Sequence, residues 1–554
     1  MMSQPVLIPR PAATLVLARD TDAAIEILLI RRTHMAEFVG GAHVFPGGGV
    51  DAADGSAEVA AHCAGLDDTE ASRVLGVEQG GLAYWTAAVR ECFEEAGLLL
   101  AVDERGEYAD ISHPQRVQVF AQLRDCVRSG QMTLARLCRE HKLRLAAGRL
   151  AYYSHWITPP GRPRRYDTRF FVAEAPPAQT PSHDNSETVA HLWIRPADAL
   201  ERHRRGEMHM VFPTIKTLES MARFAKVEDL MDFARSPRDM PVMAPRAATG
   251  REGKKLLVPS DYAYAEVGRL DPQGKGTAAA DIVSGTVVRL SDKVRRIAAP
   301  NQGDMTGPGT NSYLIGAGGD IALIDPGPMI DAHIDALLAA AGGRIRWILV
   351  THTHMDHAPA AMPLKAKTGA ELLGMAPPLE RQAESFRPDR VLAHGERIAV
   401  ADCVLRAIHT PGHASNHLCY LLEEEKLLFT GDHIVQGSTV VINPPDGDMR
   451  VYLDSLRLLQ GEDVAWFAPG HGFLMDRTQE VLERLLIHRL TRENKVLNAL
   501  RSAGAATVEA LLPAAYDDVA ARLYPAARRS LLAHLIKLQG EGRVQETRGV
   551  WSQV

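Results

Sequence analysis

The stretch "WILVTHTHMDHAPA", residues 347–360, places three histidines and an aspartate directly after an apolar run. The run predicts a buried strand, and polar groups at its end are costly to bury unless they find partners. His352 and His354 stand two positions apart at the strand end, so their side chains point the same way and can chelate one ion. Asp356 and His357 lie beyond the turn and can serve a second ion. The stretch therefore predicts a pair of bound metal ions.

Three more segments supply the same ligand types, each at the end of its own strand-like run. They are "TPGH" with His413, "TGD" with Asp432 and "PGHG" with His471. Imidazole nitrogen and carboxylate oxygen are the ligands that zinc prefers when thiolates are absent, and glycine lets the backbone come close to the metal. Scattered loop histidines would not give one pattern in four independent segments. Other histidines of the region, taken singly, favour an ordinary loop role: His409, His417 and His433.

The order of these motifs, with Asp325 in "LIDPG" ahead of them, resembles the metallo-β-lactamase-fold hydrolases throughout residues 291–475. The resemblance implies an αββα sandwich with two metals at one edge, between the sheets. By this resemblance the first zinc is bound by His352, His354 and His413. The second zinc is bound by Asp356, His357 and His471, and Asp432 takes the bridging position. Asp325 would order the metal loop without binding an ion. An aspartate at the bridging position fits hydrolases of thioesters and phosphodiesters better than true β-lactamases.

Two zinc ions in such a site activate a water for attack on a carbonyl carbon or a phosphorus, and stabilise the charge that develops on oxygen. Asp356 is the candidate for orienting this water and moving its proton. The flanking stretches resemble the β-lactamase-like endoribonuclease branch, whose mitochondrial members cut single-stranded RNA. The resemblance therefore implies an ester, a thioester or single-stranded RNA as the substrate of this domain.

Residues 478–554 resemble the winged-helix-like segment of that branch, with helices and a short final hairpin at "GRVQETRGVW". From residue 481 on, eleven Lys and Arg stand against seven Asp and Glu, in a chain whose net charge is −6. Basic side chains contact phosphates, and the candidates are Arg489, Arg492, Lys495, Arg528, Arg529 and Lys537. A solvated helical cap over the active site explains these charges equally well. A further hypothesis makes the chain an RNA-binding regulator in which this segment matters most.

The stretch "YWTAAVRECFEEAGL", residues 84–98, indicates a second chemistry. In a helix Glu91, Glu94 and Glu95 share one face, where like charges repel unless a cation lies between them. Mg²⁺ and Mn²⁺ prefer such oxygen ligands. Taken alone, the stretch favours a solvated acidic face with Arg90 as its counterion over a cation site.

Together with "FPGGGVDAAD", which starts at Phe45, this helix resembles the Nudix box. Gly48 starts the motif, Asp54 takes the place of its first glutamate, and thirty-five residues (55–89) replace the usual seven. Over residues 10–225 the arrangement is similar to the peroxisomal CoA-diphosphatase branch of the Nudix hydrolases.

The resemblance implies a divalent cation, Mg²⁺ or Mn²⁺, held by Glu91, Glu94 and Glu95, with Glu94 and Glu95 as catalytic residues. Water would attack the diphosphate of a small-molecule nucleotide or CoA-type substrate. Other candidates are three arginines for phosphate contact and one acid–base group: Arg162, Arg164, Arg165 and Glu187.

A chain of 554 residues exceeds one hydrophobic core, so several domains are expected. We expect a multidomain protein: an α/β/α Nudix-like domain, a linker or interdomain extension rich in Pro, Gly and charge, an αββα domain and a small helical winged-helix-like domain. The expected ranges are 10–225, 226–290, 291–477 and 478–554.

The composition, with 46% apolar and 23% charged residues, is that of a globular protein, and no apolar stretch is long enough to span a bilayer. Six cysteines without paired spacing suit a reducing compartment. We therefore expect a cytoplasmic protein with no membrane partner. The main hypothesis is a bifunctional hydrolase. Its alternative is that only the zinc domain is catalytic and the Nudix domain is a nucleotide-binding module.

Overall fold

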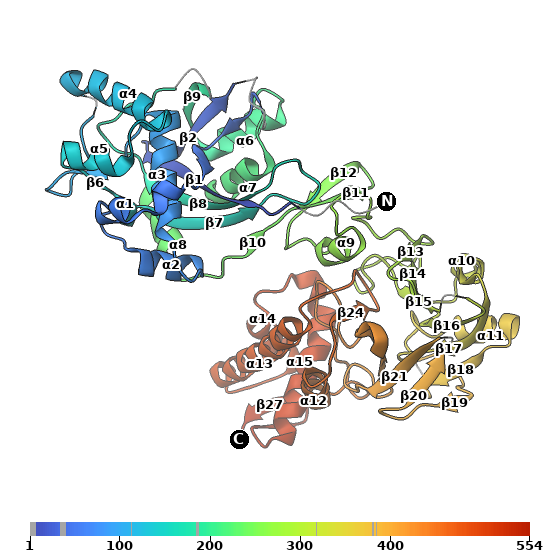
Figure 1. Cartoon of the computed structure of the whole chain (residues 1–554). Coiled ribbons are helices and arrows are strands. Elements are labelled where there is room, and N and C mark those ends of the chain that lie inside the picture. Colours follow the sequence, from blue (N-terminus) through green and yellow to red (C-terminus); the bar gives the residue numbers. More distant parts are fainter. Residues whose placement is uncertain are drawn as a thin grey trace. The chain divides into compact units, whose positions relative to one another are not determined.

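The computed structural model describes residues 7–33, 40–111, 113–183, 188–316, 318–378, 382–383, 385–400 and 402–554. The candidate Glu187 lies outside these ranges. The chain forms two compact units: the first runs up to Arg246 and adds Gln273–Lys275, and the second comprises Ala247–Pro272 and Gly276–Val554. Each unit has its own sheets (Figure 1). Each also has its own buried core.

The first unit is built on a mixed eight-stranded sheet with the main order β10-β7-β8-β1-β2-β3, in which β4 pairs with β1 and β9 with β2. The long central strand β1 pairs in parallel with β8 and antiparallel with β2. The strands are β1 (Arg10–Asp20), β2 (Ile25–Arg32), β3 (His43–Val44), β4 (Gly47–Gly49), β7 (Ala151–Ile157), β8 (Tyr166–Glu174), β9 (Thr188–Ile194) and β10 (Val242–Met243).

Helices cover both faces of this sheet, because alternate residues of its strands are apolar on both sides. Leu15 of β1 packs with Trp85 and Phe93 of α3 on one face. Val16 packs on the other face with α6, α7 and α8 through Leu218 and other residues. The α/β/α arrangement expected from the sequence is confirmed. The helices are α1 (Ala57–Ala61), α2 (Asp68–Leu75), α3 (Leu82–Ala96), α4 (Pro114–Arg128), α5 (Leu134–His141), α6 (Pro196–Arg204), α7 (Phe212–Met221) and α8 (Val227–Arg235), with a small pair β5 (Ala101–Val102) and β6 (Arg144–Leu145).

The second unit packs two sheets face to face, with orders β13-β14-β15-β16-β17-β18-β19 and β20-β21-β22-β23-β24. Tyr313 and Ile324 of one sheet meet Leu405 and Phe429 of the other in a single core. Helices α10 and α11 cover the outer face of the first sheet, and α12 and α13 cover that of the second. The αββα sandwich is therefore confirmed. Its elements are β13 (Val287–Arg289), β14 (Val294–Ala298), β15 (Asn311–Ile315), β16 (Asp320–Ile324), α10 (Asp331–Ala341), β17 (Arg344–Leu349), α11 (Ala361–Thr368), β18 (Glu371–Gly374), β19 (Arg390–Val391), β20 (Arg397–Val400), β21 (Cys403–His409), β22 (Leu418–Leu422), β23 (Leu427–Gly431), α12 (Met449–Gln460) and β24 (Trp466–Pro469).

Parallel pairing brings the polar strand ends together. Strands β16 and β17 run parallel, so Asp325 and the loop that starts at Thr351 leave the sheet at one edge. Strands β23 and β24 also run parallel, and they end just before Asp432 and His471. Segments far apart in the sequence thus deliver their functional side chains to the same end of the sandwich.

The C-terminal part is a winged-helix domain, as expected. Its first helix, α13 (Thr478–Ala503), is continuous across two cores. Val481 and Leu485 pack against the second sheet of the sandwich, whereas Val496 and Leu500 pack in a separate cluster. That cluster also contains α14 (Val508–Ala515), α15 (Tyr524–Gly540) and a three-stranded sheet in the order β25-β27-β26, with strands β25 (Ala505–Ala506), β26 (Val544–Thr547) and β27 (Val550–Gln553).

Residues 226–290, assigned above to an interdomain extension, contain regular elements that belong to both units. Helix α8 buries Leu230 and Met231 in the first unit. The hairpin β11 (Arg246–Gly250) and β12 (Gly253–Leu257) leads to helix α9 (Tyr264–Leu270), which packs in the second unit. In the described part of the chain, no helix combines the length and hydropathy needed to cross a bilayer.

A buried ion pair attaches α9 to the sandwich. Arg296 of β14 donates to both carboxylate oxygens of Glu266, at 2.6 and 2.8 Å, and each side chain is 2% exposed. Glu266 also accepts from the backbone N–H of Leu474 at 2.8 Å. Since both charges lie out of water, each depends on the other for compensation.

Replacing Glu266 with Ala is expected to lower the free energy of unfolding by about 3 kcal/mol or more, because the Arg296 charge stays buried without a partner. Urea unfolding of the full chain measures this. The double variant Glu266→Met with Arg296→Met removes both charges and is expected to regain most of the loss. An equal loss of unfolding free energy in the single and the double variant would contradict the mutual compensation of the Glu266 and Arg296 charges.

Candidate functional site

The seven side chains predicted as metal ligands lie in two adjacent groups at the edge of the sandwich. His352, His354 and His413 form one group, and the other contains Asp356, His357, Asp432 and His471. Within each group the ligand atoms all lie within 4.8 Å of one another. The structure therefore brings together every ligand that the sequence proposed for this site, from four separate segments of the chain.

In the first group three imidazole nitrogens converge. The Nε2 atoms of His352 and His413 lie 2.9 and 3.0 Å from Nδ1 of His354. Their own Nδ1 atoms are engaged elsewhere: that of His352 contacts Thr351 Oγ1 at 3.0 Å, and that of His413 contacts the carbonyl of Val441 at 2.8 Å. Hydrogen bonds at Nδ1 leave the Nε2 lone pairs free, as metal-binding histidines require.

The second group combines two imidazoles with two carboxylates. Nε2 of His357 lies 3.4 Å from both Asp356 and Asp432, and Nε2 of His471 lies 3.3 Å from the same two side chains. Oδ1 of Asp432 and both Nε2 atoms are buried without a hydrogen-bond partner. The other oxygen of Asp432 faces the first group, 3.8 Å from Nε2 of His413.

Buried polar atoms without partners are rare, and here they point at one another. Imidazole nitrogens and carboxylate oxygens arranged in this way are a potential binding group for divalent metal ions. The donor set fits two such ions, with Asp432 next to both groups. The residues that hold the site therefore match the chemistry that the family resemblance implied.

Asp325 supports the metal loop as expected. Its carboxylate accepts from the backbone N–H and Oγ1 of Thr351 at 2.7 and 2.8 Å, and lies 2.8 Å from Nδ1 of His357. Its backbone adopts φ of 50°, which is unfavourable for a residue with a side chain. Gly470 is also required by packing, since a Cβ there would come within 2.7 Å of Asp432 Oδ1.

The two groups differ in their affinity for protons. Burial, assisted by repulsion from His413, lowers the pKa of His354 to about 4. Burial also disfavours the charged form of His471, but Asp432 and Asp356 outweigh it and raise its pKa to about 9. The pKa of His357 is likewise raised well above its ordinary value, because three carboxylates overcome the effect of burial.

Two more histidines lie directly behind the ligands. His417 is fully buried, its ring lies 5.0 Å from that of His352, and its Nε2 accepts from the backbone N–H of Asp432 at 3.2 Å. His433 is also fully buried and packs 4.8 Å from the ring of Tyr452. His417 supports the site through its contacts with His352 and Asp432, and His433 packs behind it, its ring 5.8 Å from that of His417. Sequence reasoning missed this support because each histidine, judged alone, has no distinguishing spacing.

In the first unit the acidic face of α3 surrounds Arg90. Its guanidinium donates to both oxygens of Asp54, at 2.9 and 3.0 Å, and to the carbonyl of Gly49 at 2.7 Å. It also contacts Glu91 at 2.8 Å and Glu94 at 3.4 Å. Asp54 thus fulfils a structural role despite being shorter than glutamate, since it fixes Arg90 against the loop that carries Gly48.

The three glutamates of this face are held differently. Glu95 is 5% exposed and accepts from the backbone N–H of Gly47 at 2.8 Å. Burial, reinforced by Glu94, outweighs Arg90 and raises the pKa of Glu91 to about 7. No three metal-ligating atoms lie within 4.8 Å of one another in the described part of the first unit. These carboxylates share a helix face but do not converge as the seven ligands do.

The phosphate-binding candidates elsewhere in the chain mostly have internal partners. Arg165 donates to the backbone carbonyl of Thr158 at 2.9 Å. In the winged-helix domain Arg492 binds Asp518, Arg528 binds Glu509, and Lys537 binds Glu493. Arg489 is buried and donates to a backbone carbonyl, that of Val440.

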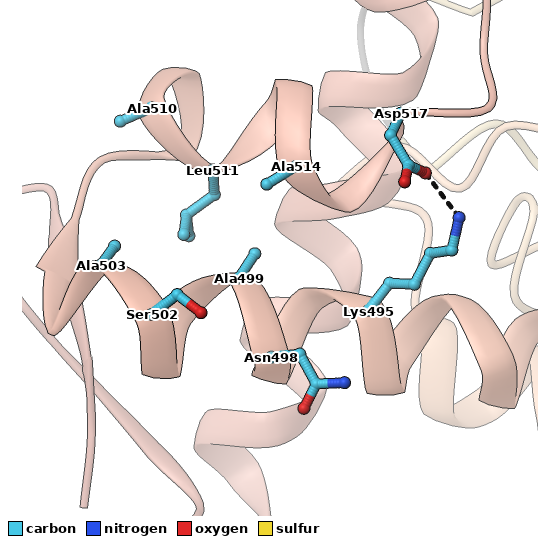
Figure 2. A pocket seen from close by; sticks show the side chains of 9 residues that line it. All are labelled: Lys495, Asn498, Ala499, Ser502, Ala503, Ala510, Leu511, Ala514 and Asp517. Atoms are coloured by element: carbon cyan, nitrogen blue, oxygen red, sulfur yellow. Dashed lines mark hydrogen bonds and ion pairs between the residues drawn. The ribbon is translucent and has the colours of Figure 1, made fainter.

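Lys495 is occupied as well. It reaches across a pocket of about 450 Å³ between α13 and α14 and binds Asp517 at 2.5 Å (Figure 2). The pocket wall is formed largely by apolar side chains, four alanines and one leucine: Ala499, Ala503, Ala510, Ala514 and Leu511. Five of the six basic side chains considered for phosphate contact are therefore engaged by partners within the fold.

These folds and this site define a metallohydrolase sandwich with a winged-helix domain, joined in one chain to a Nudix unit. Three family models match accordingly: "NUDT19 Nudix domain" over residues 67–221, "Metallo-beta-lactamase superfamily" over 305–471, and "Beta-lactamase associated winged helix domain" over 507–551. The chain belongs to the metallo-beta-lactamase superfamily and carries an additional Nudix domain at its N-terminal side.

Among its relatives is the "Atrochrysone carboxyl ACP thioesterase" of Aspergillus chevalieri, 32% identical over 273 residues, which cover 47% of this chain and 84% of the relative. The "Beta-lactamase-like protein 2 homolog" of Caenorhabditis elegans is 30% identical, with 47% and 88% covered. A solved Nudix hydrolase from Alicyclobacillus acidocaldarius is 31% identical and matches with a TM-score of 0.34, covering 41% of this chain and 96% of its own.

Lowering the pH is expected to release metal first from the group that contains His471. Its pKa of about 9 means that protons compete for this side chain below that pH, whereas His354, with a pKa of about 4, stays unprotonated. The apparent affinity of the second group should fall by up to about tenfold per pH unit for each proton displaced. Titration of zinc against a chelator at stepped pH tests this, and equal loss from both groups would contradict it.

Replacing Gly48 with Ala is expected to displace Glu91, because the new Cβ would lie 2.4 Å from Glu91 Oε1. Since only the end of a flexible side chain must move, stability should change little, while Mn²⁺ affinity should fall about tenfold. Gly49→Ala is the matched control, as its Cβ would have no neighbour within 4 Å. Equal Mn²⁺ binding by the two variants, measured by electron paramagnetic resonance, would refute this role of Gly48.

Proposed function

We propose that this chain is a hydrolase with two catalytic centres. A binuclear zinc centre in the sandwich hydrolyses an ester, most simply a thioester. A Mg²⁺- or Mn²⁺-dependent centre in the Nudix unit cleaves a nucleoside-diphosphate-linked compound. The observation that carries the proposal is the convergence of the seven ligand atoms in two adjacent groups.

Divalent ions bound by the two groups would supply Lewis-acid activation of water and neutralise charge on the attacked group. The residues of the chain supply position and proton transfer. Asp356 is the more accessible of the two carboxylates, with 27% of its side chain exposed against 14% for Asp432. It is therefore suited to orient the attacking water and to accept its proton at Oδ1, because Oδ2 faces His357 and His471. Asp432, lying between the groups, holds them at a fixed separation.

In the Nudix unit, Glu91, Glu94 and Glu95 would hold the cation. Glu95 is buried, and its contact with the backbone N–H of Gly47 ties α3 to β4. Arg90 neutralises part of the acidic charge, and a cation that binds nearby would share this task. Such a cation would supply charge neutralisation on the diphosphate oxygens during attack of water on phosphorus.

Two observations favour a thioester over RNA as the substrate of the sandwich. The Aspergillus relative is by its name a thioesterase. In addition, five of the six basic side chains considered for phosphate contact in the winged-helix domain are engaged by carboxylates or a backbone carbonyl. These intramolecular partners compete with a polyanion for the same side chains.

The alternative, in which the Nudix unit only binds a nucleotide, has support from the spread of its carboxylates. The metal-ligating atoms of the sandwich converge, whereas those of α3 do not in the described residues. The two versions differ only in whether turnover of a diphosphate depends on Glu94 and Glu95.

Two knockouts separate the centres. His352→Ala is expected to reduce hydrolysis of S-acyl thioesters by about a hundredfold or more, with diphosphate hydrolysis unchanged. Glu94→Gln with Glu95→Gln should do the opposite. The substrates are a thioester panel, a panel of nucleoside-diphosphate-linked compounds and a single-stranded RNA oligomer.

Unchanged diphosphate turnover in the glutamine variant would favour the binding module. The wild type could cleave the RNA oligomer and no thioester, and His352→Ala could lose this RNA cleavage. That result would make RNA, and not a thioester, the substrate of the sandwich. Absence of bound zinc in protein purified without chelators would overturn the zinc centre.

A further inference from the structure

The loop that orients His413 is held by the winged-helix domain. The carbonyl of Val441 accepts from His413 Nδ1 at 2.8 Å. On one side of it, the carbonyl of Val440 accepts from the guanidinium of Arg489 on α13. On the other side, the N–H of Ile442 donates to Oγ of Ser530 on α15 at 3.3 Å. Both residues next to this acceptor are thus fixed by the helices of the C-terminal domain.

Arg489 also supports the other side of His413. Its guanidinium lies over the ring of Tyr452, 5.2 Å from the centroid. Tyr452 in turn packs against Gly412, the residue before His413, so closely that a Cβ on Gly412 would lie 2.4 Å from the Cα of Tyr452. Arg489 therefore contacts the segment of Val441 directly, through Val440, and the segment of Gly412 indirectly, through Tyr452.

The burial of Arg489 needs an explanation. The residue is 2% exposed, its Nε has no hydrogen-bond partner, and no carboxylate within the described ranges forms an ion pair with it. Burying an uncompensated cation destabilises a fold. The hydrogen bond to the carbonyl of Val440 and the contact with the Tyr452 ring offset part of that cost. Val440 and Tyr452 are therefore the groups through which Arg489 acts on the site.

A second contact follows the same pattern. His471 Nδ1 lies 3.2 Å from the carbonyl of Gly309, at the end of the loop that begins after Pro300. Arg522 of the winged-helix domain binds Asp304 in this loop at 2.8 Å. Both side chains are largely exposed, so this pair contributes less than the buried contact of Arg489.

We infer that Arg489, with Ser530, is a positioning residue of the metal centre, and that the winged-helix domain is a structural part of that centre. The inference rests on the proposed zinc site. A ligand histidine is oriented by the acceptor at its other ring nitrogen, and loss of such a supporting contact weakens metal binding. The domain acts on His413 through Val441 and touches no reacting atom.

The test compares Arg489→Met with Arg492→Met in the full-length protein. Arg492 is the matched control because it lies on the same helix, is 6% exposed, and binds Ala515 and Asp518 inside the winged-helix domain. The measurements are zinc affinity by chelator competition and the visible spectrum of the cobalt-substituted protein, which reports ligand geometry. Arg489→Met should weaken zinc binding about tenfold to a hundredfold for one of two ions and alter the spectrum, while Arg492→Met retains both properties.

Ser530→Ala should give a smaller loss of zinc affinity in the same direction, because it removes one neutral hydrogen bond. Wild-type affinity and spectrum in Arg489→Met would overturn the inference and leave the proposed function intact. An equal loss in both arginine variants would also overturn it, since general destabilisation would then explain the effect. Wild-type protein that binds no zinc would overturn the proposed function, and the inference with it.

Discussion

Four imidazole rings at the edge of the sandwich each have Nδ1 engaged, and this constraint organises the second unit. The acceptors are Thr351 Oγ1, the carbonyls of Val441 and Gly309, and the carboxylate of Asp325. Because each ring is fixed at one nitrogen, the other is directed into a shared space with two carboxylates. Such a space has no stable arrangement of charges without protons or cations. The parallel strand ends, Gly470 and the strained Asp325 all serve to bring these groups within reach of one another.

The two units manage buried charge differently. In the Nudix unit Arg90 is a permanent counterion for Asp54, Glu91 and Glu94. In the sandwich no arginine or lysine of the described ranges is paired with Asp356 or Asp432, and only histidines balance them. Histidine can release its proton when a metal arrives, whereas arginine cannot. The sandwich is thus arranged to exchange protons for metal, and the Nudix face to keep its shape with or without a cation.

The convergence of these seven side chains could be predicted, because each one lies in a loop that follows a strand. Their role as metal ligands stays a prediction. The shared face of the α3 glutamates could be predicted equally well, since a helix fixes which residues lie on one side. The acceptors that orient the rings were not predictable. Val441 and Gly309 act through backbone carbonyls, which every residue has, so their side chains carry no signal. The ion pair between Asp54 and Arg90 was not predicted, because the insertion separates the two residues in the sequence.

Net charge was the weakest guide, and Arg489 shows why. A count of basic residues in the C-terminal segment treats a buried guanidinium like a solvated one. In the fold, α13 runs from the core of the sandwich into the core of the winged-helix domain, and its arginines face inward at the junction. Charges in such a place act over a few ångströms on defined partners, so they bear on the geometry of the ligands. The basic side chains of this domain are engaged in buried contacts and intramolecular ion pairs. These contacts favour a contribution to the metal site over the binding of a polyanion.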